Sequence, residues 1–304
     1  MLFKLKEGKA NRVKEDNFKL EKGIQSLVEN NMSELLGLEF ITTEFSVCNF
    51  RIDSLAYDKE SNAFIIVEYK RGRNESLIDQ GYTYLYILFD RKADFILKYN
   101  EVKNENLKIN DIDWEQCRVV FVSPKFTDYQ IKANDFKNNP IELVQIAKYE
   151  DGIIEIDRIK KNSNIKLETT ILSDETNFIE KVDKQIKVYT EEDHLYKAND
   201  EIKDLYERLK ITMLEWDSIE IDYKKLYIAF KGRTNIVDVV IQNKNLKMFL
   251  NLRMGEIDDP KQIARDISKV GHWGNGDYEI IINNDSDFEY IMSLLRQSWK
   301  KNKK

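Results

Sequence analysis

Apolar residues recur at two different spacings along the first half of the chain. A three-to-four-residue spacing, typical of helices, runs from Leu20 to a stop at Gly37 and again over residues 76–90. Alternation or short apolar runs predict strands over residues 39–47, 50–57, 63–70, 93–99, 118–123 and 153–159. Two further helices are expected near residues 129–136 and, because Pro140 suits a first helical position, over 141–148. A small hairpin is expected around Glu7-Gly8-Lys9, ahead of an α/β domain.

The second half has its own pattern. An amphipathic helix is expected over residues 195–209, followed by strands over 226–230, 236–241, 246–252 and 278–283. Asp259-Pro260 resembles the N-cap and first residue of a helix that would end at Gly271. Ser286 and Glu289 have the spacing of a capping box before a last helix. This half therefore predicts a smaller α+β domain.

The segment between the two halves is polar and weakly patterned. We therefore place the domain junction there, and expect a first domain over residues 1–160, a linker over 161–188 and a second domain over 189–304. With 3 Pro and 11 Gly in the whole chain, that linker is not of the flexible Gly/Ser type.

Composition narrows the classes of protein that the chain can belong to. Hydrophobic residues make up 42% and charged residues 34% of the 304 residues, which suits packed cores beneath a solvated surface. Because the net charge is −6, any phosphate-binding surface has to be a local basic patch. Two cysteines are too few for a disulfide framework or a zinc site. The absence of a long apolar run leads us to expect a cytoplasmic protein without a membrane span.

One predicted strand, over residues 63–70, carries charges where it should be buried. Alternate residues of a strand share a face, so Glu68 and Lys70 of VEYK continue the apolar face that begins at Phe64. If the preceding strand pairs with it as a hairpin, Asp53 meets Glu68 near one end of the sheet. Two carboxylates and an ammonium there would suit a hard divalent cation and a phosphate. A salt-bridged edge strand would give the same local pattern.

Two helices add candidate residues. Glu21 falls within the apolar stripe of the first helix, where a carboxylate needs a metal, a cation or donors. It also lies near the helix start, where the helix dipole alone favours an acidic residue. On the later helix, Gln80 and Tyr84 are four residues apart and share a face, a spacing also common at the edge of any amphipathic helix.

Taken in order, these residues resemble the PD-(D/E)XK nuclease superfamily. Asp53 in RID, Glu68 and Lys70 in VEYK, and then Gln80 and Tyr84 match its core, in the branch that carries a QxxxY motif. The resemblance covers about residues 20–159 and implies a restriction-endonuclease-like mixed sheet flanked by helices. Ile52, where the superfamily's name has proline, is a common departure.

The resemblance implies a role for each matching residue. Asp53 and Glu68 would ligate Mg²⁺ or Mn²⁺, and Lys70 would assist the hydrolytic water. Glu21 would support the metal site, while Gln80 would position substrate or active-site groups with Tyr84 beside it. The loop after VEYK adds two basic candidates for contact with nucleic acid, Arg71 and Arg73, and Tyr84 on the helix that follows is a third candidate. An ordinary solvated basic loop would carry the same arginines.

The second half resembles a C-terminal domain of unknown function that accompanies such nuclease-like domains. The resemblance rests on GHWGNGDYEI, residues 271–280, and RQSW, residues 296–299. His272 and Trp273 could recognise a base, because an aromatic face stacks on any base. Alternatively, the glycines shape a helix-to-strand connection with Trp273 packed beneath it. The domain could equally form a homodimer.

Three functions remain open at this level. The first is a metal-dependent nuclease acting on phosphodiester bonds, most readily of DNA, in defence or repair. The second is a non-catalytic nucleic-acid-binding module on a nuclease-like fold. The third is a protein-interaction module that works through its C-terminal domain. A fold by itself does not decide among them.

Overall fold

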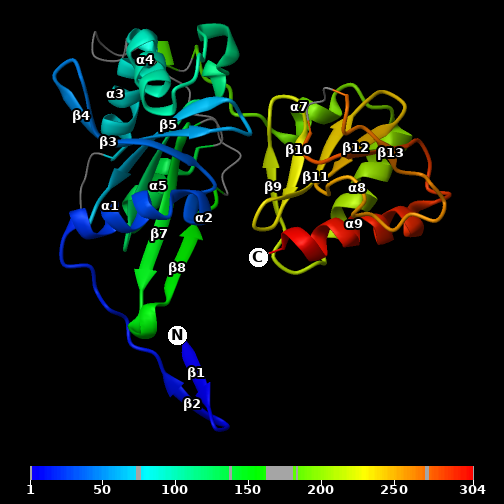
Figure 1. Ribbon diagram of the computed structural model, residues 1–304, viewed down its shortest axis with the longest axis horizontal. Coiled ribbons are helices and arrows are strands. Elements are labelled where there is room, and N and C mark those ends of the chain that lie inside the picture. The colour runs from blue at the N-terminus through cyan, green and yellow to red at the C-terminus, as the bar shows by residue number, and fades with distance from the viewer. Residues whose placement is uncertain are drawn as a thin grey trace. The chain divides into compact units, whose positions relative to one another are not determined.

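The computed structural model describes residues 2–72, 77–136, 139–161, 181–182, 184–270 and 274–303. The chain divides into two compact units, Met1–Val188 and Tyr189–Lys304 (Figure 1). Residues 162–180 and 183, most of the segment in which we expected a linker, lie outside the described residues. Residues 181–188 belong to the first unit, because Val182 is fully buried in its core and Lys187 hydrogen-bonds to Glu115.

The first unit is built around a six-stranded mixed sheet. Its strands, in chain order, are β3 (Glu39–Val47), β4 (Phe50–Asp58), β5 (Ala63–Tyr69), β6 (Arg118–Ser123), β7 (Ile141–Lys148) and β8 (Ile154–Arg158), and they lie side by side in the same order. The β5–β6 and β6–β7 pairs are parallel, and the other pairs are antiparallel. Because these pairs are parallel, the carboxyl ends of β5, β6 and β7 lie at the same end of the sheet.

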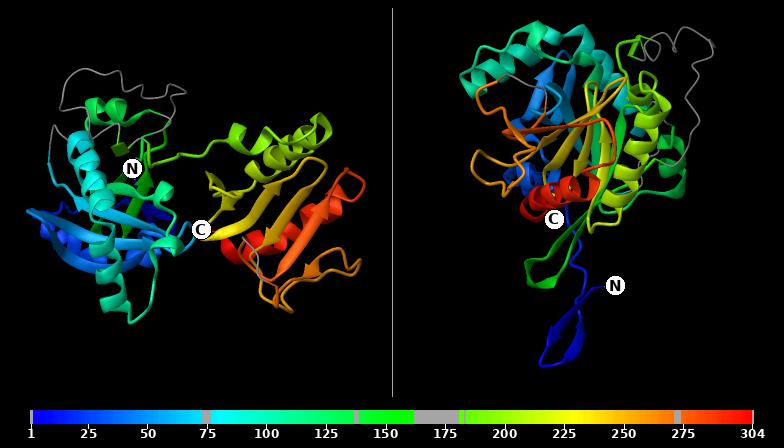
Figure 2. Two further views of the ribbon diagram at one scale, coloured as in Figure 1. Left: turned by 90° about the horizontal axis from the view of Figure 1, so that it is seen from above. Right: turned by 90° about the vertical axis from the view of Figure 1, so that its right-hand side faces the viewer.

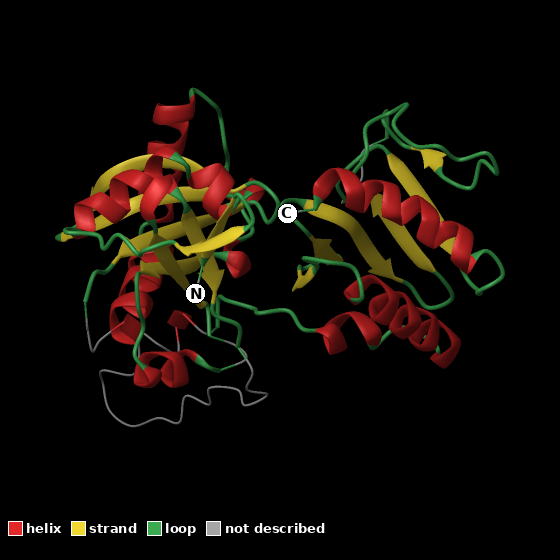
Figure 3. Ribbon diagram, turned by 90° about the horizontal axis from the view of Figure 1, so that it is seen from below, coloured by secondary structure: helices red, strands yellow, loops and turns green. Residues whose placement is uncertain are grey.

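Helices cover both faces of this sheet (Figure 3). They are α1 (Glu21–Asn30), α2 (Met32–Leu36), α3 (Leu77–Asp90), α4 (Lys92–Lys103) and α5 (Asp128–Asn134), with short 3₁₀ turns η1 (Ile109–Asp111), η2 (Trp114–Gln116) and η3 (Glu150–Gly152). Residues of α1 and α2 pack with Ala56, Ile65 and Val67 on one face of the sheet. Residues of α3 and α4 pack on the other face with Phe64 and Ile66. Every residue of β5 is consequently buried.

Two elements of this unit differ from the sequence-based expectation. Residues 93–99 belong to α4 and not to a strand, because Phe95 and Tyr99, one helical turn apart, both insert into the core beside Phe64. Residues 141–148 form β7 and not a helix, because their apolar side chains fill the cores on both faces of a strand between β6 and β8. A short apolar run does not distinguish these possibilities by itself. The predicted first helix is also divided in two, at Asn31.

The described residues of the second unit form a six-stranded antiparallel sheet and three helices. Along the sheet the strands lie in the order β13 (Arg265–Asp266), β14 (Tyr278–Ile282), β12 (Leu246–Leu250), β11 (Asn235–Ile241), β10 (Ile228–Lys231) and β9 (Glu220–Tyr223). The helices are α7 (Glu191–Leu195), α8 (Asp200–Leu214) and α9 (Phe288–Asn302), and the last two share one core with the sheet. Together with the first unit, this confirms an α/β mixed sheet flanked by helices and a smaller C-terminal α+β region.

The prediction of a helix after Asp259-Pro260 is wrong. One oxygen of the Asp259 carboxylate accepts the N–H of Ala264, at 2.7 Å, and the other accepts the Tyr290 hydroxyl, at 2.6 Å. These bonds hold an irregular loop that leads to β13. At α9 the helix itself is confirmed, but its N-cap is Asp287 without a side-chain capping bond, so the predicted Ser286 cap is wrong. Among the described residues, no helix combines the length and apolar character needed to cross a membrane.

Candidate functional site

The pairing of β4 with β5 ends one residue before the charged positions. Ser54 and Val67 form the last matched pair, and beyond them the strands separate. The side chains of the next residues bridge the opening. The Asp53 backbone N–H donates to Glu68 Oε1 at 3.0 Å, and the Tyr69 backbone N–H donates to Asp53 Oδ2 at 3.1 Å. The two carboxylates are thereby brought to one point at the end of the strands.

Groups on β5 and α3 hold the second oxygen of Glu68. Lys70 Nζ lies 3.4 Å from Glu68 Oε2, and Gln80 Nε2 donates to the same oxygen at 3.2 Å. Gln80 also donates to the Tyr84 hydroxyl at 3.0 Å, which in turn donates to the Arg51 carbonyl at 3.5 Å. Gln80 and Tyr84 were predicted to share a face of α3, and this face lies against the end of β5 that carries Glu68.

A residue that the sequence reasoning missed holds Asp53 from the other face. Gln25 of α1 is 4% exposed, and its Nε2 donates to the Asp53 carbonyl and to Glu29 Oε1, both at 2.9 Å. Glu29 also accepts the Ser54 hydroxyl at 2.6 Å. The signal was present in the sequence, since Gln25 is a polar residue beside Ile24 and Val28 of the apolar stripe.

Burial makes the two carboxylates hard to charge together. Removal from water raises the pKa of Glu68 to about 7, and the neighbouring Asp53 adds to the rise. Burial likewise raises the pKa of Asp53 above its usual value, against the hydrogen bond from Tyr69 and the charge of Lys70. Since Glu68 is 2% exposed, a positive charge between the two groups would relieve a real electrostatic cost.

The donor set fits a hard divalent cation. Asp53 Oδ1 makes no hydrogen bond to a described residue, so it is free to ligate beside the Glu68 carboxylate. Mg²⁺ typically takes one or two protein carboxylates and keeps several waters. Over the described part of the chain, no group of three or more Asp, Glu, His or Cys side chains is arranged around a metal position. The cation would therefore rest on Asp53 and Glu68, with water and substrate supplying the other ligands.

The remaining predicted residues have different outcomes. Glu21 is exposed in the first turn of α1, not buried in its stripe, and its Oε1 accepts the Arg71 backbone N–H at 2.9 Å. Arg71 is exposed next to Lys70. Tyr84, which we expected to contact nucleic acid, is 6% exposed, so its ring is not accessible for stacking on a base. Its hydroxyl instead accepts a hydrogen bond from Gln80 and helps to position that side chain. Arg73, His272 and Trp273 lie outside the described residues.

The part of the GHWGNGD motif that the structure describes is held by a buried acid. Asp238 of β11 is fully buried, and its Oδ2 accepts the Asn275 backbone N–H at 2.7 Å and Asn275 Nδ2 at 3.0 Å. Its Oδ1 accepts Asn235 Nδ2 at 2.7 Å. Gly276 has φ +90°, and a Cβ there would lie 1.9 Å from the Leu250 carbonyl oxygen. The glycine therefore shapes this connection, which joins a loop, not the expected helix, to β14.

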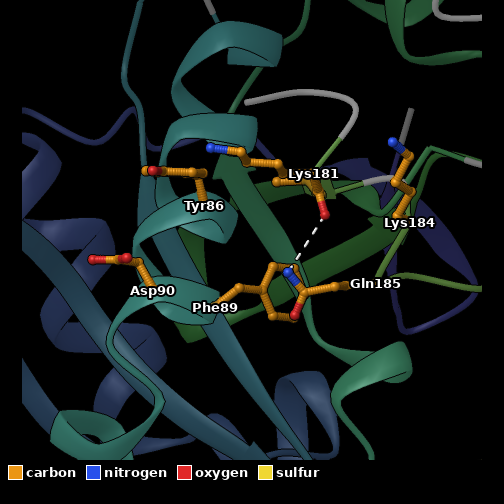
Figure 4. A pocket seen from close by; sticks show the side chains of 7 residues that line it. Tyr86, Phe89, Asp90, Lys181, Lys184 and Gln185 are labelled. Carbon is orange, nitrogen blue, oxygen red and sulfur yellow. Dashed lines mark hydrogen bonds between the residues drawn. The ribbon is translucent and has the colours of Figure 1, made fainter. Parts of the chain in front are cut away.

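A separate cavity of about 390 Å³ lies elsewhere on the first unit (Figure 4). Its lining includes Tyr86, Phe89 and Asp90 of α3, together with Lys181 and Gln185. At ~100° per residue, Tyr86 and Phe89 lie on the side of α3 opposite the face that carries Gln80 and Tyr84. The cavity is therefore distinct from the Asp53–Glu68 cluster.

Comparison with known proteins gives three likenesses. Residues 191–302 match a family described as "Domain of unknown function (DUF5655)", as the RQSW and GNGD segments led us to expect. A protein of Haemophilus influenzae described as "Uncharacterized protein" is 48% identical over 303 residues, which are 98% of this chain and 99% of that protein. A solved structure titled "Structure of EndoMS-dsDNA2 complex" is similar with a TM-score of 0.30 and 16% identity, over 45% of this chain and 50% of that chain. The chain belongs, over nearly its whole length, to the same family as the Haemophilus influenzae protein, and its C-terminal part matches the DUF5655 family.

Proposed function

We propose that the protein is a metal-dependent nuclease that hydrolyses phosphodiester bonds, with DNA as its substrate. The observation that carries the proposal is the meeting of Asp53, Glu68 and Lys70 where β4 and β5 separate. A fold designed only for stability would place apolar side chains there, since an ion pair that includes two acids costs more to bury than it returns. The ordered resemblance to the PD-(D/E)XK superfamily supports the same function.

The reaction requires water to attack the phosphorus atom while the bond to the leaving oxygen breaks and that oxygen takes up a proton. A divalent cation held by Asp53 and Glu68 would act as a Lewis acid on the phosphate. Lys70 would orient the attacking water or donate from its ammonium to a non-bridging phosphate oxygen, and the position of its Nζ, 3.4 Å from Glu68 Oε2 at the strand end, supports this role. Gln80 fixes the Glu68 carboxylate, and Tyr84 fixes Gln80.

The loop that follows Lys70 would meet the rest of the substrate. Arg71 is exposed, and the bond from its backbone N–H to Glu21 ties this loop to the start of α1. A guanidinium at this place can contact a phosphate on either side of the one that is cut. Glu21 would in this way act on the substrate through the position of Arg71, and not as a metal ligand.

A cleavage assay tests the proposal. Single- and double-stranded DNA and RNA are incubated with the wild type and with Lys70→Ala, in Mg²⁺, Mn²⁺ or EDTA. The matched control is Lys59→Ala, which removes an exposed lysine from the other end of the same β4–β5 hairpin. We expect DNA cleavage that needs the metal, is lost in Lys70→Ala and is kept in Lys59→Ala.

Two results would contradict the proposal. Cleavage in EDTA equal to that in Mg²⁺ would exclude a metal-dependent reaction. The absence of cleavage by folded wild type with either metal, combined with binding to the same DNA, would favour the non-catalytic binding module.

A further inference from the structure

Among the described strands of the first unit, only those of the N-terminal hairpin, β1 (Phe3–Lys6) and β2 (Lys9–Arg12), are exposed along their whole length. All eight strand residues are exposed, including Phe3 at 53% and Leu5 at 75%. Figures 1 and 2 show the hairpin extending away from the sheet, beyond the end where β7 and β8 join. An isolated two-stranded hairpin is only marginally stable in water, so this ribbon gains stability if another molecule covers it.

The register gives the ribbon two chemically different faces. Residues directly opposite each other share a face, so Lys4, Lys6, Lys9 and Asn11 lie together, and Phe3, Leu5, Ala10 and Arg12 lie on the reverse. Lys4 pairs with Asp151 at 2.8 Å, whereas the ammonium groups of Lys6 and Lys9 have no partner among the described residues. The ribbon therefore presents two uncompensated cations directly opposite each other near its tip.

The charge of this segment is opposite to that of the whole chain. Residues 2–14 contain five basic side chains, Lys4, Lys6, Lys9, Arg12 and Lys14, against the single acid Glu7, whereas the complete chain carries a net charge of −6. A nucleic-acid-binding surface on such a chain has to be a local basic patch. The ribbon meets that requirement.

The ribbon is attached at the end of the sheet where the candidate site lies, the carboxyl end of the parallel strands. Tyr69, Val122 and Val144 lie at one level of the parallel strands, and β7 continues from there to Lys148, about 13 Å further at ~3.3 Å per residue. At that point the Lys148 carbonyl accepts the Asp16 backbone N–H, and the Glu150 backbone N–H donates to the Lys14 carbonyl. From Lys14 the chain runs five residues to Lys9, at most about 17 Å at ~3.3 Å per residue. The two lengths together are about 30 Å and one turn of B-DNA spans about 34 Å, so a duplex cut at Asp53–Glu68 can reach Lys6 and Lys9 within a turn.

From these observations we propose that the β1–β2 ribbon is an arm that contacts double-stranded DNA, with Lys6 and Lys9 on its phosphates. The major groove of B-DNA admits a two-stranded β-ribbon, so the shape of the arm fits as well as its charge. This inference rests on the proposed nuclease function for the identity of the substrate. The proposed role of the arm is in binding alone: the arm would hold the duplex at phosphates remote from the one that is cut.

Binding in EDTA separates the arm from catalysis. The dissociation constant of a fluorescently labelled 30-base-pair duplex is measured at several salt concentrations for the wild type and for Lys6→Gln/Lys9→Gln. The control is Lys59→Gln/Lys108→Gln, which removes two exposed lysines from segments that precede β5 and β6 and so lie at the opposite edge of the sheet. If each arm lysine neutralises one phosphate, the slope of log K against log salt becomes shallower by about 1.8. Binding at ~0.1 M salt is then weaker by more than about tenfold, while the control matches the wild type.

The possible outcomes separate this inference from the proposed function. Equal slopes and affinities for the arm variant and the control would overturn the arm, even if the wild type cleaves DNA. Weakened duplex binding by an arm variant of a protein that cuts nothing would support the arm and contradict the nuclease. The ribbon could instead bind a second copy of the chain, and light scattering tests this alternative by measuring the oligomeric state. A wild-type dimer that Phe3→Ser/Leu5→Ser converts to a monomer, with unchanged DNA binding by Lys6→Gln/Lys9→Gln, would assign the ribbon to self-association and overturn the proposal.

Discussion

Each unit of the molecule buries an acid on a largely apolar strand, and the two acids have different surroundings. Asp238 of β11 is surrounded by donors, with the backbone and side chain of Asn275 and the side chain of Asn235 satisfying both oxygens. Glu68 of β5 also accepts hydrogen bonds, but it lies beside a second carboxylate, Asp53, and its pKa is raised to about 7.

This difference is the basis for assigning a structural role to Asp238 and, under the proposed function, a catalytic role to Glu68. Both oxygens of the Asp238 carboxylate accept hydrogen bonds whose loss would loosen the loop at Asn275, so we assign it a structural role. Lys70 supplies one positive charge beside the two carboxylates of Asp53 and Glu68, so a divalent cation, as in the proposed function, would lower the cost of charging both. Substitutions should consequently affect stability in the second unit and activity in the first.

The largest effect on stability is expected for Asp238→Ala. The change removes the carboxylate that accepts three N–H groups, one from the buried side chain of Asn235 and two from the half-buried Asn275, which costs about 3 kcal/mol of the unfolding free energy. Chemical denaturation of the full chain measures the loss. Asp204→Ala, at an exposed position of α8, is the control and should change little. A loss below ~1 kcal/mol for Asp238→Ala would remove the structural role.

The next effect concerns the glycine of the same motif. Gly276→Ala combines a positive φ with a Cβ 1.9 Å from the Leu250 carbonyl oxygen, so it should cost at least about 2 kcal/mol. Gly255→Ala has a similar φ of +85° with open space around its Cβ, and should cost about 1 kcal/mol. Thermal unfolding of the two variants separates the steric cost from the backbone cost. Equal losses would mean that the close approach to β12 contributes nothing.

A smaller effect is expected at the α3 residue that orients Glu68. Gln80→Ala removes one donor to Glu68 Oε2 and should reduce kcat about tenfold, or about 1.4 kcal/mol, with KM nearly unchanged. Tyr84→Phe removes the hydroxyl that fixes Gln80, and should reduce kcat less. Steady-state kinetics on a short duplex measure both. A change confined to KM would show that Gln80 contacts substrate and does not position the carboxylate.

The smallest effect on stability is expected for Asp53→Asn, in contrast to the large loss expected for Asp238→Ala. Asp53→Asn keeps an oxygen for the Tyr69 N–H and removes a desolvated charge, so in EDTA the protein should be unchanged or more stable by up to about 1 kcal/mol. Mn²⁺ should raise the Tm of the wild type and not that of Asp53→Asn. Equal rises in Tm would place the cation elsewhere.

The sequence allowed the candidate site to be located because its residues follow short-range rules. Alternation along β5 puts Glu68 and Lys70 on the face that begins at Phe64, and four-residue spacing puts Gln80 and Tyr84 on one face of α3. The hairpin of β4 and β5 then brings Asp53 to Glu68, because adjacent antiparallel strands have a defined register.

Other features depended on contacts that sequence spacing does not encode. Asp238 in NIVDVVI has the same local pattern as Glu68 in IIVEYK, an acid inside an apolar strand, but its donor Asn275 is distant in the chain. Residues 141–148 become a strand because β6 and β8 flank them, and residues 93–99 become a helix because Phe95 and Tyr99 face one core. In each case tertiary packing overrides an ambiguous local pattern.

The most direct test compares Asp53→Asn with Asp238→Asn in one cleavage experiment on duplex DNA with Mg²⁺, at a temperature where both variants are folded. We predict that Asp53→Asn loses activity by about 10³-fold or more while its Tm is kept, which corresponds to about 4 kcal/mol of transition-state stabilisation. Asp238→Asn should have a lower Tm and cleave at nearly the wild-type rate. Cleavage by Asp53→Asn at the wild-type rate would contradict the assignment of the Asp53–Glu68 cluster as a catalytic metal site.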